Sequence, residues 1–392
     1  MKIVLAVLGA VLLLAVVALL PLPMRPYLDF QVLYHADLGL LRGIPLYDHA
    51  GQVNMIAHLA HVQPEQVFVL PFPYPPWYAL STLWLALVPI DVAARLWFGV
   101  SLILLALSVW LLQAKRTGRI RLTLSLLAIL WAPVLGSLFV GQYGFPVLLG
   151  AALMAYALRQ EKAALLAIAG ILLTFKPHLG GLILVLALVH LLTRRGPSAR
   201  SGLIALATAG VVLLAVSFVA SPAWPLAYWQ SLTGFKDVSQ CNQCVSPAML
   251  AASFAGRGLD LAVWIAAVLA VGIGYWLVRN WSRLSTSADY LVSAGVLATL
   301  IVSPYLQNYD YLLLLVPFFE LSRTAKGWGW AWLALAFLAP LAALALLGTA
   351  GNGWLMLSTA ILLIQFTRGI SAGRVPSVQN GAPSSRPPLS PP

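Results

Sequence analysis

The sequence predicts an all-α polytopic membrane protein, a bundle of about 12 (11–13) transmembrane helices with a long first extracytoplasmic loop that carries short interfacial helices. The composition, the apolar stretches and the distribution of basic residues predict this class. Hydrophobic residues make up 61% of the 392 residues and charged residues only 9%, whereas soluble proteins have about a quarter charged. A soluble fold of this composition would have a mostly apolar surface. A cytosolic enzyme, a secreted domain and a nucleic-acid-binding protein are therefore excluded.

The apolar stretches approach the length of about 20 residues that crosses a bilayer. The first follows Lys2 and has no clear small-residue cleavage site, which favours an uncleaved span over a signal peptide. Residues 76–90 are short and aromatic, and we interpret them as an interfacial or half-crossing helix; the alternative is one further crossing and a flipped C-terminus. The expected spans are 3–22, 92–113, 122–140, 145–158, 163–175, 178–192, 201–220, 260–278, 287–303, 309–321, 328–348 and 353–367.

The basic residues give the topology. The net charge of +12 reflects a shortage of acids, with 23 Lys and Arg against 11 Asp and Glu. Bases cluster between alternate spans, so the positive-inside rule places these loops and both termini in the cytoplasm. Residues 1–368 then form the bundle, and the Pro- and Ser-rich tail 369–392 is expected to be disordered. The clusters are Lys115, Arg116, Arg119 and Arg121; Arg194, Arg195 and Arg200; Arg279 and Arg283; Arg323 and Lys326; Arg368 and Arg374.

The first external loop, 23–75, is rich in ionisable residues. It holds four of the 11 acids and four of the 6 histidines. Asp29 follows the end of the first span, at the boundary between water and lipid. A carboxylate held there is suited to act as a general base on a substrate that arrives in the membrane plane. The alternative is that Asp29 is the N-cap of the helix expected to follow it.

Four further polar motifs fall at predicted outer ends of spans. Taken alone, each motif is best explained by Gly and Pro residues that terminate helices. Lys176 is unusual because it lies on the base-poor side, where phosphate binding with His178 as a second donor would account for it. Snorkelling of the lysine to the interface is the alternative. The motifs are Tyr74-Pro75-Pro76, Gly141-Gln142-Tyr143, Lys176-Pro177-His178 and Ser303-Pro304-Tyr305 running on to Tyr309-Asp310.

Metal and nucleotide chemistry have little support in the sequence. Cys241 and Cys244 in the second long external loop, 221–258, either form a small disulfide or stay free, and no further zinc ligands lie nearby. His58 and His61 have a helical metal-ligand spacing but no third ligand. Phosphate-binding loops and dinucleotide fingerprints are absent. We therefore expect no metal and no cofactor, and if the protein transfers a group, its donor is not a nucleotide bound in the cytosol.

Taken in order, these motifs resemble glycosyltransferase family 87, also catalogued as domain of unknown function 2029, within the GT-C class of glycosyltransferases that use polyprenyl-phosphate sugars. The resemblance covers about residues 1–320, and each motif is weak alone. The matching pieces are Asp29 with Tyr34 and Ala36; Leu40 and Gly43 through Leu46-Tyr47-Asp48; Tyr74-Pro75-Pro76; Gly141-Gln142; Lys176-Pro177; and Ser303-Pro304.

The resemblance implies a bacterial inner-membrane enzyme with its active site facing the periplasm or cell exterior. It would move a sugar, often mannose, from a polyprenyl-phosphate carrier to a glycolipid or glycan acceptor with inversion, and Asp29 would be the catalytic base. The candidate ligands of the donor phosphate are Lys176, His178, Gln142, Arg42 and His35. The candidate substrate contacts are Tyr34, Tyr47, Tyr74, Asn308 and Asp310.

One departure from the family pattern bears on the donor phosphate. Many relatives have histidines soon after the late Ser-Pro, and here Asn308 and Asp310 occupy that stretch. Because Asp310 would repel a phosphate, we expect it to meet the acceptor sugar or a nearby base. Two other classes remain open from the sequence, a transporter or flippase for a lipid-linked or polar solute and a non-catalytic scaffold. The ionisable residues lie mostly at span ends, which favours the enzyme over a transporter.

Overall fold

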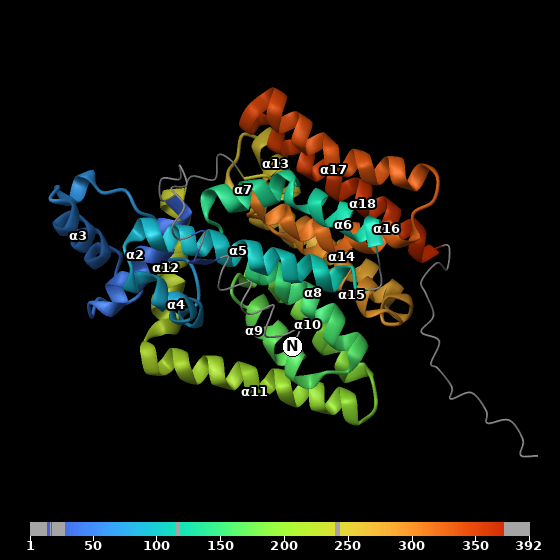
Figure 1. Ribbon diagram of the computed structural model, residues 1–392, viewed down its shortest axis with the longest axis horizontal. Coiled ribbons are helices and arrows are strands. Elements are labelled where there is room, and N and C mark those ends of the chain that lie inside the picture. The colour runs from blue at the N-terminus through green and yellow to red at the C-terminus, as the bar shows by residue number, and fades with distance from the viewer. Residues whose placement is uncertain (1–13, 16, 18–27, 115–117, 240–243, 372–392) are drawn as a thin grey trace, which may run out of the picture.

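A computed structural model describes residues 14, 15, 17, 28–114, 118–239 and 244–371. All regular secondary structure in these residues is helical (Figure 1). The elements are α2 (Leu28–Leu41), α3 (His49–Ala60), η1 (Pro64–Gln66), α4 (Pro76–Thr82), η2 (Leu83–Leu87), α5 (Ile90–Leu112), α6 (Gly118–Ile129), α7 (Ala132–Val140), α8 (Gly144–Gln160), α9 (Ala163–Leu173), α10 (Pro177–Thr193), α11 (Pro197–Ala220), α12 (Trp224–Ser239), α13 (Pro247–Phe254), α14 (Leu259–Leu284), α15 (Ala288–Val302), η3 (Asn308–Leu314), α16 (Leu315–Thr324), α17 (Trp328–Leu347), η4 (Gly348–Gly353) and α18 (Trp354–Ser371).

The prediction of an all-helical, multi-pass membrane protein is confirmed. Within the described residues, five helices are long and apolar enough to cross a membrane, or six if α6 and α7, bent by 50°, form one span. Helices α9, α10 and α15 are apolar but shorter. The predicted total of about 12 spans thus stays a prediction. The first predicted span, 3–22, and the predicted tail, 369–392, lie almost wholly outside the described residues, and residues 369–371 of the tail belong to α18.

Residues 76–87 form the short helices α4 and η2. The seven residues of α4 extend for about 10 Å, a third of the hydrocarbon thickness. Both elements contact α2, and just beyond them Tyr34 Oη on α2 donates a hydrogen bond to Val88 O at 2.9 Å. The segment therefore starts and ends beside α2, and its interpretation as an interfacial or half-crossing helix stays a prediction.

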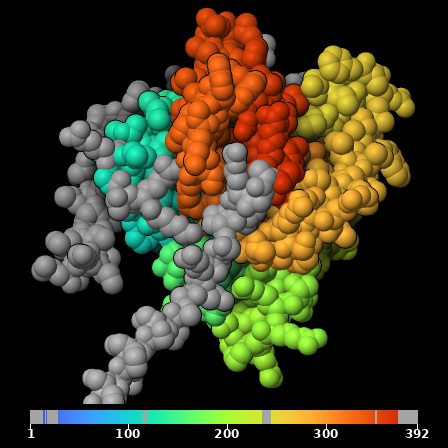
Figure 2. Space-filling view, turned by 90° about the vertical axis from the view of Figure 1, so that its right-hand side faces the viewer, coloured from blue at the N-terminus to red at the C-terminus, as the bar shows by residue number. Residues whose placement is uncertain are grey.

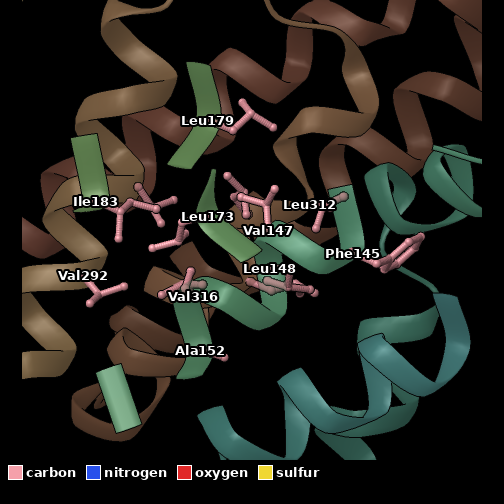
Figure 3. Packing of buried hydrophobic residues seen from close by; sticks show 14 of the residues in the cluster. Phe145, Val147, Leu148, Ala152, Leu173, Leu179, Ile183, Val292, Leu312 and Val316 are labelled. Carbon is pink, nitrogen blue, oxygen red and sulfur yellow. The ribbon is translucent and has the colours of Figure 1, made fainter. Parts of the chain in front are cut away.

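The core lies between α8, α10, α15 and the η3–α16 segment. Leu148, Ile183 and Val316 meet there (Figure 3), each almost fully buried. Helix α8 is buried nearly all round, whereas α11 and α14 expose large apolar residues along their length, including Val219 and Val271. A helix with an apolar exposed face fits the lipid-facing rim of a bundle, and a helix apolar on every side fits its centre.

An ionic cluster joins α8, α15 and α16 at the end of the bundle away from α2. Arg159 and Arg323 both contact the carboxylate of Asp289, the latter at 3.2 Å, and Arg323 also pairs with Glu320. The four groups carry two charges of each sign, so each buried carboxylate has a cationic partner. Asp289 and Glu320 thus have a structural role in joining these three helices.

Substitution of Gly180 by alanine is expected to destabilise the α9–α10 hairpin by about 1–3 kcal/mol or more. A Cβ on Gly180 would lie 2.0 Å from Leu173 O, which is backbone and cannot rotate away. Next to it, Gly181 faces open space, so Gly181→Ala should leave stability unchanged or raise it by up to about 1 kcal/mol. Thermal unfolding of both variants in detergent measures the difference. Equal melting temperatures would contradict this packing.

Candidate active site

Four breaks between helices meet at the end of the bundle where α2, α3 and α4 gather (Figure 1). They are the start of α2, the α7–α8 turn, the α9–α10 turn and the segment between α15 and η3. All four outer motifs of the sequence lie in or beside these breaks. Residues that terminate helices there also position polar side chains.

The α7–α8 turn places Gln142. Gly141 ends α7 in the left-handed conformation (φ 67°), which glycine adopts without strain. Gln142 N donates to Ser137 O at 2.9 Å, and Trp97 Nε1 on α5 donates to Gly141 O at 3.0 Å. The turn is therefore tied to two helices, and the Gln142 side chain has a fixed origin.

The α9–α10 turn places Lys176. Lys176 is the N-cap residue of α10 and Pro177 is the first helical residue, a position where the missing proline N–H costs no hydrogen bond. Lys176 O accepts from Leu179 N and Gly180 N at 2.9 and 3.0 Å. The Lys176 side chain is only 3% exposed. This burial contradicts snorkelling, because a snorkelling lysine keeps its ammonium group in water.

A continuous chain of hydrogen bonds links the four breaks. Gln142 Nε2 donates to Asp29 Oδ2 at 2.7 Å. Lys176 Nζ donates to Gln142 Oε1 at 2.9 Å and to Asp310 Oδ1 at 2.8 Å. A lysine is a donor only, so the amide oxygen of Gln142 must face Lys176 and its NH₂ group must face Asp29. The orientation of the amide is thus determined by the lysine.

Asp310 is held rigidly at the far end of this chain. Its Oδ2 accepts from Gln307 N at 2.9 Å, and its side chain is 1% exposed. Nearby, Ser137 Oγ on α7 donates to Tyr309 O at 3.2 Å. Asp310 therefore meets a nearby base, Lys176, one of the two partners expected from the sequence.

The environment of Asp29 sets its protonation behaviour. Burial raises the pKa of Asp29 above the ordinary aspartate value, while the Gln142 hydrogen bond and the charge of Lys176 act in the opposite direction. Its carboxylate bonds to a residue 113 positions away and lies within the first turn of α2. The capping explanation is therefore not needed to account for this side chain.

Tyrosine rings form one wall beside Asp29. The ring of Tyr143 packs edge-on against Tyr74 at 5.0 Å and against Tyr78 at 5.3 Å between centroids. Tyr143 Oη donates to Asp29 O and accepts from Leu33 N at 3.3 Å. Because these rings are buried and interlocked, the first turn of α2 is fixed against the α7–α8 turn.

These groups line a cavity of about 340 Å³. Its polar side carries Asp29, Gln142, Lys176, His178 and Asp310. Leu70, Leu232, Leu259 and Val263 give the same cavity an apolar wall. The cavity therefore combines a carboxylate, a cation and a hydrocarbon surface.

Six of the eleven predicted site residues line this cavity: Asp29, Gln142, Lys176, His178, Tyr74 and Asp310. The ring of His178 packs edge-on against Tyr305 at 6.4 Å. Tyr74 contributes both its ring and the carbonyl that accepts from Tyr47 Oη at 2.8 Å.

The other five predicted residues have different surroundings. Tyr47 lines a second cavity of about 450 Å³ between α3 and α12. Tyr34 bonds to Val88, and Asn308 Nδ2 donates to Asn352 Oδ1 at 3.2 Å. His35 packs against the Tyr34 ring, burial lowers its pKa to about 4, and Arg42 is exposed. Their roles as ligands stay predictions.

Sequence reasoning missed several cavity residues. Tyr143, Tyr305 and Tyr309 stand inside motifs that the sequence singles out, and their adjacency to Gln142 and Asp310 was an available signal. Gln307, which holds Asp310, gives no such signal, since its contribution comes from its backbone N–H. In the second external loop, Cys244 is disulfide-bonded, and Cys241, the other cysteine of the chain, lies outside the described residues.

The described residues form an all-helical membrane bundle in which a carboxylate, a lysine and an apolar wall share one cavity. The chain belongs to Glycosyltransferase family 87, whose family model matches residues 72–304, more than half of the sequence. It is therefore a membrane glycosyltransferase, as the motifs of the sequence predict. No curated protein matches the chain.

The matched residues include Tyr74, Gln142, Lys176 and His178. Asp29 and Asp310 lie outside the matched range. Hydrogen bonds to Gln142 and Lys176, which lie in the matched range, connect both aspartates to it.

Substitution of Gln142 by leucine is expected to move the acid limb of the kcat/KM profile to higher pH by about one unit or more. The amide hydrogen bond stabilises the ionised form of Asp29, and a hydrogen bond to a charged group contributes about 1.5–3 kcal/mol. Its loss raises the pKa, so Asp29 becomes protonated at a higher pH. Gln230→Leu, on the exposed surface of α12, is the control. An unchanged or lower acid limb in Gln142→Leu would contradict the role of this amide.

Proposed function

We propose that the protein transfers a sugar, with mannose as the first candidate, from a polyprenyl-phosphate carrier to a glycolipid or glycan acceptor on the extracytoplasmic face. The observation that carries this proposal is the Asp29–Gln142–Lys176–Asp310 chain in a cavity that apolar side chains also line. The polar and the apolar lining match the two parts of a lipid-linked sugar phosphate.

Asp29 is proposed to act as the general base. Its carboxylate takes the proton of an acceptor hydroxyl while that oxygen attacks the anomeric carbon. The bond between the anomeric carbon and the phosphate oxygen breaks, and its electron pair leaves with the polyprenyl phosphate. Attack from the face opposite the leaving group inverts the anomeric configuration. The proton passes from Asp29 to water after the product leaves.

Lys176 is proposed to stabilise the leaving phosphate. An ammonium group has three N–H donors, and Gln142 and Asp310 accept two of them. Its remaining neighbour is the Tyr309 ring, whose centroid lies 5.1 Å from Nζ, and we propose that the third N–H turns to a phosphate oxygen whose negative charge increases as the bond breaks. A cation fixed in a site that excludes water stabilises such charge more than one in bulk water. His178 and the second N–H of the Gln142 amide add neutral donors on the same wall.

The apolar wall fits the carrier. Leu232, Leu259 and Val263 come from α12 and from the first turns of α14. Helix α14 is a membrane-crossing candidate with an exposed apolar surface. A prenyl chain lying along it would stay in hydrocarbon while its phosphate reaches Lys176.

The test is a transfer assay on purified protein in nanodiscs, with radiolabelled polyprenyl-phosphate mannose and a membrane glycolipid extract. Labelled glycolipid that forms with time and enzyme, with an α-linkage from a β-linked donor, is the expected result. A panel of other polyprenyl-phosphate sugars identifies the donor if mannose is not transferred. Turnover of a nucleotide sugar, but of no polyprenyl-phosphate sugar, would overturn the proposal. Movement of an intact lipid-linked sugar across the bilayer without transfer would support a flippase instead.

A further inference from the structure

A second polar cavity lies at the opposite end of α10 from Lys176. Its volume is about 410 Å³, and it is lined by the end of α8, the end of α10 and the start of α11. The 17 residues of α10 extend for about 25 Å, so this cavity and the candidate active site lie near opposite faces of the bundle. In Figure 1 the α10–α11 connection is at the lower right, away from α2 and α3. Figure 2 looks onto this end of the molecule, where α11 forms the green lower part.

His190 is the feature that indicates a ligand there. It is 3% exposed and lines the cavity, yet its Nδ1 has no hydrogen-bond partner among the described residues. Buried polar side-chain atoms are normally paired, and an unpaired one costs about 1–3 kcal/mol. An imidazole on a cavity wall is paired once a hydrogen-bonding ligand enters.

The charges around His190 favour an anion. Arg194 and Arg195 line the cavity and are exposed. Helix α11 begins there, and no side chain caps it, so its first N–H groups and the positive end of its dipole face the same space. Ser198 adds a hydroxyl donor. Glu161 is the single acid on the wall, so the lining carries two positive charges against one negative.

We propose that this cavity binds a phosphate-bearing anion, held by Arg194 and Arg195, by the N-terminal turn of α11 and by His190. Guanidinium groups and backbone N–H groups are the donors that phosphate oxygens prefer. The cavity opens at a bundle end lined with basic residues, where anionic lipid headgroups concentrate. The ligand is thus either the headgroup of an anionic phospholipid or a soluble phosphate. The proposal does not depend on the transfer reaction, because it concerns the other face of the bundle.

The experiment is native mass spectrometry of the purified full-length protein with phosphatidylglycerol or phosphatidylcholine. Wild type is expected to retain phosphatidylglycerol in preference to phosphatidylcholine. Arg194→Gln combined with Arg195→Gln should lower retention of phosphatidylglycerol about tenfold or more, from the loss of two cations near the headgroup. Arg279→Gln, an exposed arginine near the far end of α14, is the control for loss of basic charge on this face and should retain the lipid as wild type does.

Added inorganic phosphate distinguishes the two sources. If millimolar phosphate displaces the lipid from wild type and raises its melting temperature, the site takes soluble phosphate. If phosphatidylglycerol stays bound, the ligand is the lipid headgroup. His190→Phe, which keeps the ring and removes its hydrogen-bonding atoms, should weaken either ligand. Equal retention of phosphatidylglycerol by the double variant and wild type, with no response to phosphate, would overturn the proposal.

Discussion

Substitution of Asp29 by asparagine is expected to lower kcat for sugar transfer by about 10²- to 10⁴-fold, the usual contribution of a general base. Asparagine has nearly the same shape and can still accept from Gln142 Nε2, so the hydrogen-bonded chain and the fold should survive. It cannot take a proton from the acceptor hydroxyl. KM for the donor should change little, because the carboxylate is proposed to act on the acceptor.

The control for Asp29→Asn is Asp48→Asn. Asp48 is in the same external loop, where its carboxylate caps α3 by accepting from Gly51 N at 2.9 Å. Asparagine is an equally good N-cap residue, so both stability and activity should stay near wild type. Equal transfer by wild type and Asp29→Asn would remove Asp29 from the mechanism. Unfolding of Asp29→Asn would be visible as a lower melting temperature, which separates loss of structure from loss of chemistry.

The fold class could be predicted because it follows from composition and local pattern. Few charges and long apolar runs require a membrane bundle, whatever the detailed packing. The ends of some helices could also be predicted, since Gly141 ends a helix in the left-handed conformation and Pro177 begins one. The number of crossings was harder to predict. Helices such as α9 and α15 are shorter than a bilayer requires, and a hydropathy pattern does not determine where a helix bends or breaks.

In the candidate site, residue types could be predicted but not their partners. Lys176 on a base-poor side indicated an anion. Phosphate binding and snorkelling, the two explanations for this lysine, differ in the burial of its ammonium group, which the sequence does not show. Its partner Asp310 is 134 positions away. Nothing in local spacing relates the two, because packing of α7, α10 and η3 brings them together. For the same reason, the sequence could not predict that Tyr34 bonds to Val88, whereas other residues of the motif set line the cavity.

Removal of the Lys176 side chain is expected to have two separable effects. In Lys176→Met, the carboxyl group of Asp310, which is 1% exposed, loses its cationic partner, and breaking a buried pair costs about 3–5 kcal/mol of stability. The leaving phosphate also loses its stabilising charge, which should lower kcat by about 10²- to 10³-fold. The single variant alone does not tell these effects apart.

The double variant Lys176→Met with Asp310→Asn separates them. It removes both charges and leaves an amide oxygen that can still accept from Gln307 N, and replacing both members of a buried pair is often neutral. The melting temperature should return toward that of wild type, whereas transfer should stay low. If Lys176 only holds Asp310 in place, the restored fold would restore transfer as well. A stable but inactive double variant, beside an Asp310→Asn single variant that still transfers, therefore assigns the lysine to the leaving phosphate, since no other described residue of this cavity carries a side chain that is cationic at every physiological pH.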